Sequence, residues 1–235
     1  MKNIYLILTC LAIAGCTREQ PPASKPEPAK ARESRPAASA PPASAKLADD
    51  RPVIVAFGDS LSAGFGADPG QSYPDFVQKE LDQRGYRYHV VNAGISGDTT
   101  TDGLERIRTV TALQPAVAIL EFGGNDGLRG LPVSTTRANL EQMILALQKT
   151  GAKIVLAGMT LPPNYGPEYI RSFEAVYKDL AKQYRLPLIP FLLLGVGGNP
   201  ALMQRDGIHP TGAGNRIVAK NVMQVLEPLL SRKAG

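Results

Sequence analysis

The chain has 235 residues, a formal net charge of +5 and two cysteines, a size that suits one ordinary domain with appendages. Both cysteines, Cys10 and Cys16, lie near the amino end, which excludes a disulfide, a thiolate metal site and a catalytic cysteine in the rest of the chain. The positive charge is scattered, and no basic run is interleaved with aromatic residues. We therefore expect no binding of nucleic acid.

The amino end has the pattern of an export signal. Lys2 precedes an apolar run at 4–14 that is too short to span a bilayer as a mature helix. Ile13-Ala-Gly-Cys16 resembles the bacterial lipobox, which implies acylation of Cys16 and a membrane anchor at the amino end. Thr17, in place of a retaining aspartate, favours the outer membrane, facing the periplasm. An ordinary signal peptide that carries a cysteine, and hence a secreted or periplasmic protein, is the alternative.

Residues 17–50 are rich in Pro, Ala and Ser and contain almost no large apolar residue, so they cannot build a core. We expect a disordered tether with a coil length of about 30 Å and an extended limit of about 100 Å. Such a tether would space the domain from the lipid surface. The expected organisation is a lipoprotein signal peptide at 1–16, the tether at 17–50 and one folded domain at 51–235.

From residue 51 onward, short apolar runs alternate with longer amphipathic ones, which is typical of an α/β domain. The expected strands are 53–57, 88–92, 117–122, 153–157 and 187–190. The expected helices are 72–83, 99–109, 134–149, 167–184 and 211–230. Because a helix follows every strand, right-handed crossovers predict one five-stranded parallel sheet with helices on both faces. A domain of this size folds without a metal or a disulfide.

The apolar, β-branched run 53–57 is typical of a strand covered on both faces, and it ends abruptly at Gly58. Asp59 and Ser60 then open a helical turn. Ser60 is therefore expected at the carboxyl end of a central strand, where open α/β sheets bind their ligands. The free N–H groups of the first helical turn suit a developing negative charge. From these residues alone, Ser60 is either a nucleophile or a structural N-cap.

The chain holds two histidines, His89 and His209. His89 lies inside an apolar run, away from the carboxyl end of its strand, and a structural role is expected for it. His209 lies in a loop bounded by glycine and proline, three residues after Asp206. Asp206 can accept the imidazole N–H, which fixes the tautomer and stabilises the imidazolium. The alternative is a turn in which the aspartate caps the last helix.

Two polar segments follow other strands of the predicted sheet. The glycines of 92–99 permit a tight backbone that presents an N–H to a ligand, and 121–127 places Asn125 in a loop just beyond its strand. A hydrolytic serine needs such donors at the oxyanion. Glycine-rich loops can instead cradle a phosphate. Neither a Walker lysine nor a G-x-G-x-x-G spacing is present, which argues against a nucleotide.

Four sequence blocks occur in the order and rough spacing of the SGNH, or GDSL, hydrolases. They are Gly58-Asp-Ser-Leu61, Ile95-Ser-Gly-Asp-Thr99, Gly123-Gly-Asn-Asp126 and Asp206-Gly-Ile-His209. The chain resembles most closely the bacterial periplasmic thioesterase I, lysophospholipase and arylesterase group, to which 121–130 and 161–166 are also similar. The resemblance does not cover the first fifty residues. It implies a flavodoxin-like three-layer α/β/α sandwich, and the missing G-x-S-x-G elbow argues against the larger α/β-hydrolase fold.

The resemblance also implies a role for each matching residue. The implied catalytic residues are Ser60 as nucleophile, His209 as general base and acid, and Asp206 as its orienting partner. The implied oxyanion donors are the backbone N–H groups of Ser60 and Gly97 and the side-chain amide of Asn125. Asp59 and Asp126 are expected to structure their loops. The segment 161–167 would border an acyl pocket, and 191–194 would form an apolar wall or simply pack in the core.

The predicted function is hydrolysis of a carboxylic ester or thioester through an acyl-enzyme. The candidate substrates are small-molecule acyl or aryl esters, lysophospholipids and acyl-CoA. We expect a monomer that needs no cofactor and no metal. A carbohydrate acetylesterase, which uses the same chemistry on a polar substrate, is one alternative. A surface lipoprotein that binds without catalysis is the other, although the complete set of matching site residues argues against it.

Overall fold

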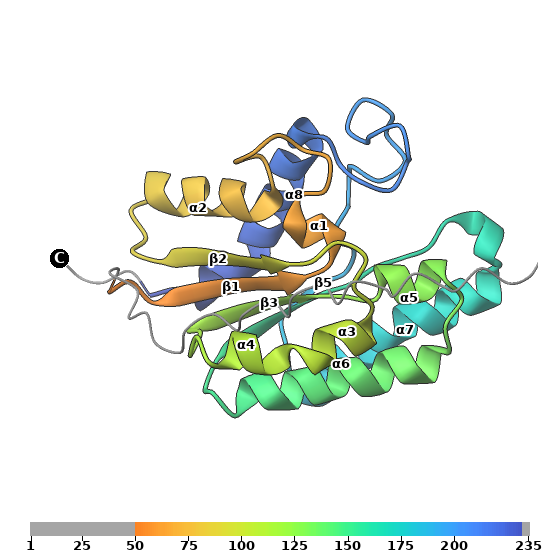
Figure 1. Cartoon of the computed structure of the whole chain (residues 1–235), viewed down its shortest axis with the longest axis horizontal. Coiled ribbons are helices and arrows are strands. Elements are labelled where there is room, and N and C mark those ends of the chain that lie inside the picture. The colour runs from red at the N-terminus through yellow and green to blue at the C-terminus, as the bar shows by residue number, and fades with distance from the viewer. Residues whose placement is uncertain (1–49, 232–235) are drawn as a thin grey trace, which may run out of the picture. The chain divides into compact units, whose positions relative to one another are not determined.

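The computed structural model describes residues 50–231 (Figure 1). The predictions for 1–16 and for 17–50, lipidation of Cys16 included, lie outside the described residues except at residue 50. In the described part, five parallel strands form one sheet in the order β2-β1-β3-β4-β5. They are β1 (Val53–Gly58), β2 (His89–Gly94), β3 (Val117–Glu121), β4 (Lys153–Ala157) and β5 (Leu188–Ile189). This order is the flavodoxin-like one, so the predicted α/β fold class is confirmed.

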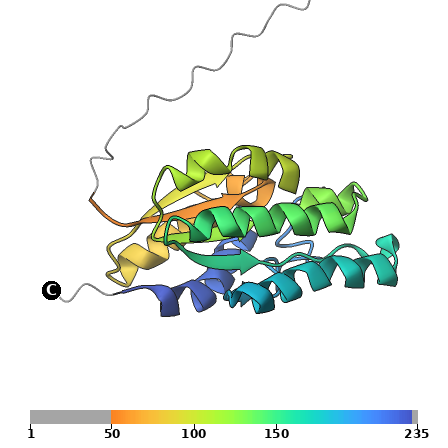
Figure 2. The same cartoon turned by 90° about the horizontal axis from the view of Figure 1, so that it is seen from below.

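Helices cover both faces of the sheet. They are α1 (Ser60–Ala63), α2 (Tyr73–Gln83), α3 (Thr100–Glu105), α4 (Ile107–Thr111), α5 (Gly124–Leu128), α6 (Val133–Gln148), α7 (Pro167–Tyr184) and α8 (Gly212–Leu226), with 3₁₀ turns η1 (Pro163–Tyr165) and η2 (Glu227–Leu229). Helices α2 and α8 pack together on one face, and α3, α4, α6 and α7 lie on the other (Figure 1). Figure 2 shows α6 and α7 side by side. The sheet is thus the middle layer of three.

The central strands β1 and β3 are buried at every residue, as their apolar runs predict, and in β3 this burial includes the terminal Glu121. In register, Val55 of β1 pairs with Val91 of β2 and with Ala118 of β3. Around them, a continuous apolar core extends from the sheet to the inner faces of the helices. Within residues 50–231, the helices are too short or too polar for any of them to cross a bilayer.

Most predicted elements differ from the structure by one or two residues at their ends, and the larger differences are these. The helix predicted at 99–109 is divided into α3 and α4 at Arg106, whose φ of −101° and ψ of 10° are not helical. The helix predicted at 211–230 ends at Leu226 and continues as η2, because Pro228 cannot donate the next helical hydrogen bond. The stretch that contains Asn125, predicted as a loop, forms the short helix α5.

Candidate active site

Ser60 lies at the carboxyl end of the central strand β1, in the first position of α1. Asp59 is the N-cap of this helix, and its Oδ1 accepts the N–H of Leu61 at 3.0 Å. Ser60 is only 9% exposed. As the first helical residue it carries an N–H that has no acceptor inside the helix. The turn therefore presents a hydroxyl and a backbone donor together at the edge where ligands of such sheets bind.

His209 lies against Ser60, although 149 residues separate them in the chain. Its Nε2 is 2.9 Å from Ser60 Oγ, and its Nδ1 is 2.7 Å from Oδ2 of Asp206. The other carboxylate oxygen of Asp206 accepts the backbone N–H groups of Ile208 and His209, at 2.9 and 3.0 Å. The ring of Phe65 packs on the imidazole, with 4.6 Å between their centroids. The structure thus forms a continuous serine, histidine and aspartate chain of contacts.

Two effects act on the pKa of Asp206. Burial raises this pKa, but the hydrogen bonds from the His209 ring and from the backbone N–H groups of His209 and Ile208 outweigh burial and lower it to about 2. The carboxylate is therefore ionised at neutral pH. An ionised carboxylate at Nδ1 directs the free electron pair of Nε2 toward the Ser60 hydroxyl and stabilises the imidazolium that proton transfer creates.

Asn125 of α5 lies between the Ser60 turn and the loop after β2. Its Nδ2 donates to Asp98 O at 2.9 Å and to Asp59 Oδ2 at 3.2 Å. Gly97, one residue before Asp98, has a φ of 89°, and its N–H has no hydrogen-bond partner within residues 50–231. A backbone donor that lacks a partner and an amide held beside it are the components of an oxyanion site.

The turn that leads to Asn125 depends on a residue that the sequence did not single out. Tyr177 of α7 is fully buried and donates its hydroxyl to Phe122 O at 2.9 Å. A Cβ at Gly123 would lie 2.2 Å from this hydroxyl, and the φ of Gly123 is 112°. Only glycine fits this conformation and this close approach. Gly123, the first glycine of the pair before Asn125, therefore makes room for the tyrosine that anchors the turn.

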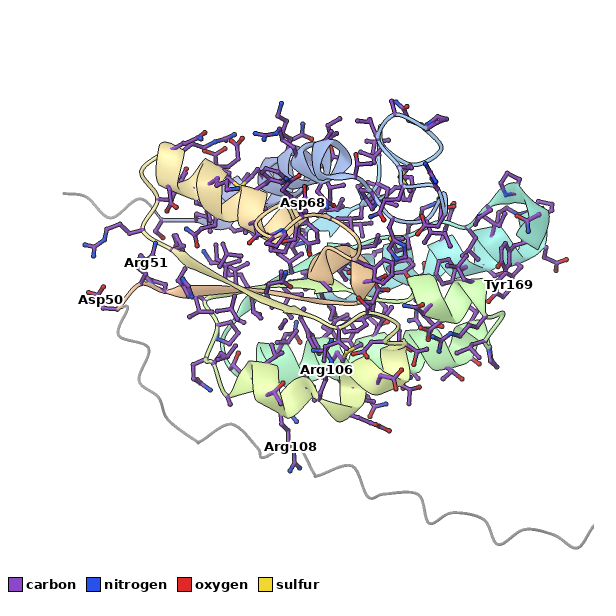
Figure 3. The ribbon with its side chains drawn as sticks, turned by 45° about the horizontal axis from the view of Figure 1, so that its top comes forward. Asp50, Arg51, Asp68, Arg106, Arg108 and Tyr169 are labelled. Atoms are coloured by element: carbon purple, nitrogen blue, oxygen red, sulfur yellow. The ribbon has the colours of Figure 1, made fainter. Side chains whose placement is uncertain are left out.

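Arg106 is a second residue that shapes the site although the sequence analysis did not single it out. Figure 3 labels it on the side of the sheet where α3 and α4 lie. Its Nε donates to Asp98 Oδ2 at 2.6 Å, and its Nη atoms donate to Ala93 O and Gly58 O, each at 2.8 Å. Its guanidinium also stacks on Phe57, 4.6 Å from the ring centroid. Arg106 therefore ties the ends of β1 and β2 to the Gly97 loop. An arginine inside a predicted helix gives no local signal of such a role.

A cavity of ≈ 390 Å³ adjoins the histidine loop. Residues 159–163 after β4 line it together with Phe191, Leu193 and Ile208, and Gly124 and Leu128 of α5 complete it. Its lining is largely apolar, which is typical of a small-molecule site in this size range. Both segments considered for an acyl pocket, 161–167 and 191–194, contribute to its wall. The cavity can hold an apolar chain beside the residues that contact Ser60.

Two residues considered in the sequence analysis, His89 and Asp126, do not contact Ser60, His209 or Asp206. His89 Nδ1 is 3.4 Å from Arg51 Nη2, at the start of β2 and so at the opposite edge of the sheet. Asp126 is buried and accepts the N–H and hydroxyl of Thr100, at 2.9 and 2.5 Å, which joins α5 to α3. Within residues 50–231, no three His, Cys, Asp or Glu side chains are grouped so as to hold a metal ion.

Comparison with known proteins gives consistent matches over this domain. Residues 56–217 match the GDSL-like lipase/acylhydrolase family. The chain is 46% identical over 179 residues to "Esterase TesA" of Pseudomonas aeruginosa, with 76% of this chain and 89% of that protein covered. It is 37% identical over 180 residues to "Thioesterase 1/protease 1/lysophospholipase L1" of Escherichia coli (strain K12), with 76% and 85% covered.

A solved structure, "Crystal Structure of TesA", superposes on 76% of this chain and 99% of its own with a TM-score of 0.74 and 46% sequence identity. The similarity therefore extends from the sequence to the arrangement of the whole sheet and its helices.

Proposed function

This chain belongs to the GDSL-like lipase/acylhydrolase family and is a serine hydrolase of esters or thioesters, and we propose that Ser60, His209 and Asp206 are its catalytic residues. The single observation that carries this assignment is the 2.9 Å contact between His209 Nε2 and Ser60 Oγ, with Asp206 on the other ring nitrogen. Geometry of this kind defines a nucleophile, its base and the group that orients the base.

In the proposed reaction, Nε2 of His209 takes the proton of the Ser60 hydroxyl as Oγ attacks the carbonyl carbon of the ester. The C–O⁻ group that forms accepts hydrogen bonds from the N–H groups of Ser60 and Gly97 and from the amide of Asn125. The amide of Asn125 has two N–H groups, which contact Asp98 O and Asp59 Oδ2 in this structure. The longer contact, to Asp59, is the one that the oxyanion would replace.

Imidazolium then protonates the leaving alcohol or thiol, the bond from the carbonyl carbon breaks, and the acyl group stays on Ser60 Oγ. A water molecule attacks this acyl-enzyme with His209 as the base again, which releases the carboxylic acid and restores the hydroxyl. Asp206 remains ionised throughout, since its pKa is about 2. Apart from this water, every group in the proposed steps is a side chain or a backbone N–H of the chain.

The cavity beside His209 supports acyl or aryl esters as substrates. Its apolar walls can bury a hydrocarbon chain, which gains about 0.8 kcal/mol per buried CH₂ group. The thioesterase, lysophospholipase and esterase names of the relatives agree with such substrates. The lipobox-like segment before Cys16 adds a location to the proposal, a lipid-anchored domain in the cell envelope.

A serine-directed phosphonate tests the assignment. Folded wild-type protein should be labelled at Ser60 only, and Ser60→Ala should be neither labelled nor active on p-nitrophenyl esters and acyl thioesters of varied chain length. Ser134→Ala, on the exposed side of α6, is the matched control and should behave as wild type. Failure of the folded wild-type protein to be labelled at Ser60 would refute the assignment. Turnover of acetylated sugars but not of longer acyl esters would favour the acetylesterase instead.

A further inference from the structure

Glu121 is a buried acid that the reaction above does not use. It is the last residue of β3, it pairs with Gly58 of β1 in the sheet, and its side chain is 0% exposed. Glutamate is almost never fully buried unless it has a charged partner. Within residues 50–231, Glu121 makes no ion pair. Its complete burial therefore requires an explanation.

The contacts of Glu121 lie on both sides of Ser60. Its Oε2 accepts the backbone N–H of Asp59 at 3.2 Å and the hydroxyl of Ser62 at 2.8 Å. The Ser62 oxygen is in turn 2.9 Å from the hydroxyl of Tyr73 in α2. One carboxyl oxygen on β3 thus fixes the residue before Ser60 and the residue two positions after it.

The glycine of the first sequence block makes room for this acid. A Cβ at Gly58 would lie 2.2 Å from Glu121 Oε2 and 2.3 Å from Ser62 Oγ. Real Cβ atoms do not approach other atoms so closely, and the backbone of Gly58 has no positive φ that would demand glycine. The close approach of the carboxyl group is therefore the physical reason for glycine at this position.

The surroundings of Glu121 favour its neutral form. Its second oxygen, Oε1, is buried and has no hydrogen-bond partner within residues 50–231. Burying an ionised carboxylate is strongly unfavourable when one of its oxygens accepts no hydrogen bond. Burial, together with the nearby Asp59 carboxyl group, raises the pKa of Glu121 well above its usual value. The raised pKa thus favours the protonated acid, in which the carbonyl oxygen accepts both hydrogen bonds.

We infer that Glu121 is a positioning residue, which holds the Ser60 turn in its reactive geometry by accepting the Asp59 N–H and the Ser62 hydroxyl with one oxygen. The inference rests on the proposed role of Ser60. If these contacts are lost, the turn can shift while its core packing persists. A displacement of about 1 Å in a reacting group can cost about a hundredfold in rate.

Two substitutions of similar size separate the accepting oxygen from the ionisable group, and both are made in the full-length chain. Glu121→Gln keeps the accepting oxygen, and Glu121→Met removes it. We expect Glu121→Met to lower kcat on a p-nitrophenyl ester about tenfold or more with KM within about twofold, and Glu121→Gln to retain kcat within about threefold of wild type. Phosphonate titration counts the active sites, so that kcat refers to folded enzyme only.

Leu147→Ala in α6 is the matched control for lost stability, since Leu147 is fully buried. This variant should unfold at a lower temperature while its kcat per active site stays at the wild-type value. If Glu121→Met also keeps the wild-type kcat per site, its role is merely structural and the inference is wrong. If the kcat of Glu121→Gln falls as far as that of Glu121→Met, the accepting oxygen does not determine the rate, and the inference is again wrong.

Ser62→Ala keeps the test decisive should Glu121→Met fail to fold. It removes one of the two donors to Glu121, so kcat should fall several-fold with KM unchanged. Where both variants fold, the double variant should be no slower than Glu121→Met alone, because both changes act through the same contact. A wild-type kcat for Ser62→Ala would overturn the inference. So would a double variant that is slower than Glu121→Met by the same factor by which Ser62→Ala is slower than wild type. Labelling of wild-type Ser60 stays a separate result, so failure of the proposed function is recognised independently.

Discussion

The two sides of the candidate active site are held in different ways. On the nucleophile side, Asp59, Ser60 and Ser62 are 2%, 9% and 0% exposed, and hydrogen bonds join their turn to the central strand β3. On the base side, the Asp206 side chain is 37% exposed, and Ile208 is 43% exposed. The loop from Asp206 to His209, the base loop, is shaped mainly by hydrogen bonds between neighbours in the chain.

This difference separates stability from activity. Changes in the base loop should reduce turnover with little effect on folding, because few buried contacts depend on it. Changes around the Ser60 turn, here called the nucleophile turn, should affect both turnover and stability, because this turn is part of the core. Each experiment below tests one part of this contrast.

Asp206→Asn tests the base side and should have the largest effect on turnover among the three. The amide cannot supply the negative charge that orients and stabilises the imidazolium, so kcat should fall about a thousandfold or more. The free energy of unfolding should fall by no more than about 1 kcal/mol, because the amide oxygen of asparagine can still accept the two backbone N–H groups and solvent screens the lost charge. Steady-state kinetics and denaturant unfolding measure the two quantities. A large loss of stability would show that the base loop is not held locally.

Asn125→Ala tests the region where the two sides meet. Loss of one oxyanion donor costs about 2.7 to 4 kcal/mol of barrier, so kcat should fall about a hundredfold or more. The amide also bridges Asp98 and Asp59, so the unfolding free energy should fall as well, by about 1 kcal/mol. Near-wild-type turnover in the folded variant would remove Asn125 from the site.

Asp59→Asn tests the burial of the nucleophile turn and should have the smallest effect on turnover of the three, because an amide oxygen can still accept the N–H of Leu61. Burial raises the pKa of Asp59 from 3.8 to about 6. The folded state therefore binds a proton that the unfolded chain has released, and wild-type stability should fall between pH 4 and about 6, by at most about 1.4 kcal/mol per pH unit. The variant lacks this group, so its unfolding free energy relative to wild type should rise over that range. An unchanged difference would mean that Asp59 titrates normally.

How much of the site the sequence predicts differs from residue to residue. The serine, asparagine and histidine blocks were recognisable because each is a short run whose neighbours in the chain define it. Arg106 and Tyr177 were not, because each donates to backbone carbonyls at or just after the ends of strands that are not its neighbours in the chain. The helix break at Arg106 carries neither glycine nor proline, so no local pattern marks it.

By itself, the amino-acid sequence determined the alternation of strands and helices, the central place of β1 and the residue types of the site, because hydrophobic periodicity and short motifs are local properties of the chain. The tertiary structure alone decided that His209 meets Ser60 across 149 residues, that two separate segments line one cavity, and that Glu121 lies beneath the nucleophile turn. Such contacts form only when the strands pair in register and the helices pack on them, which no single stretch of sequence encodes.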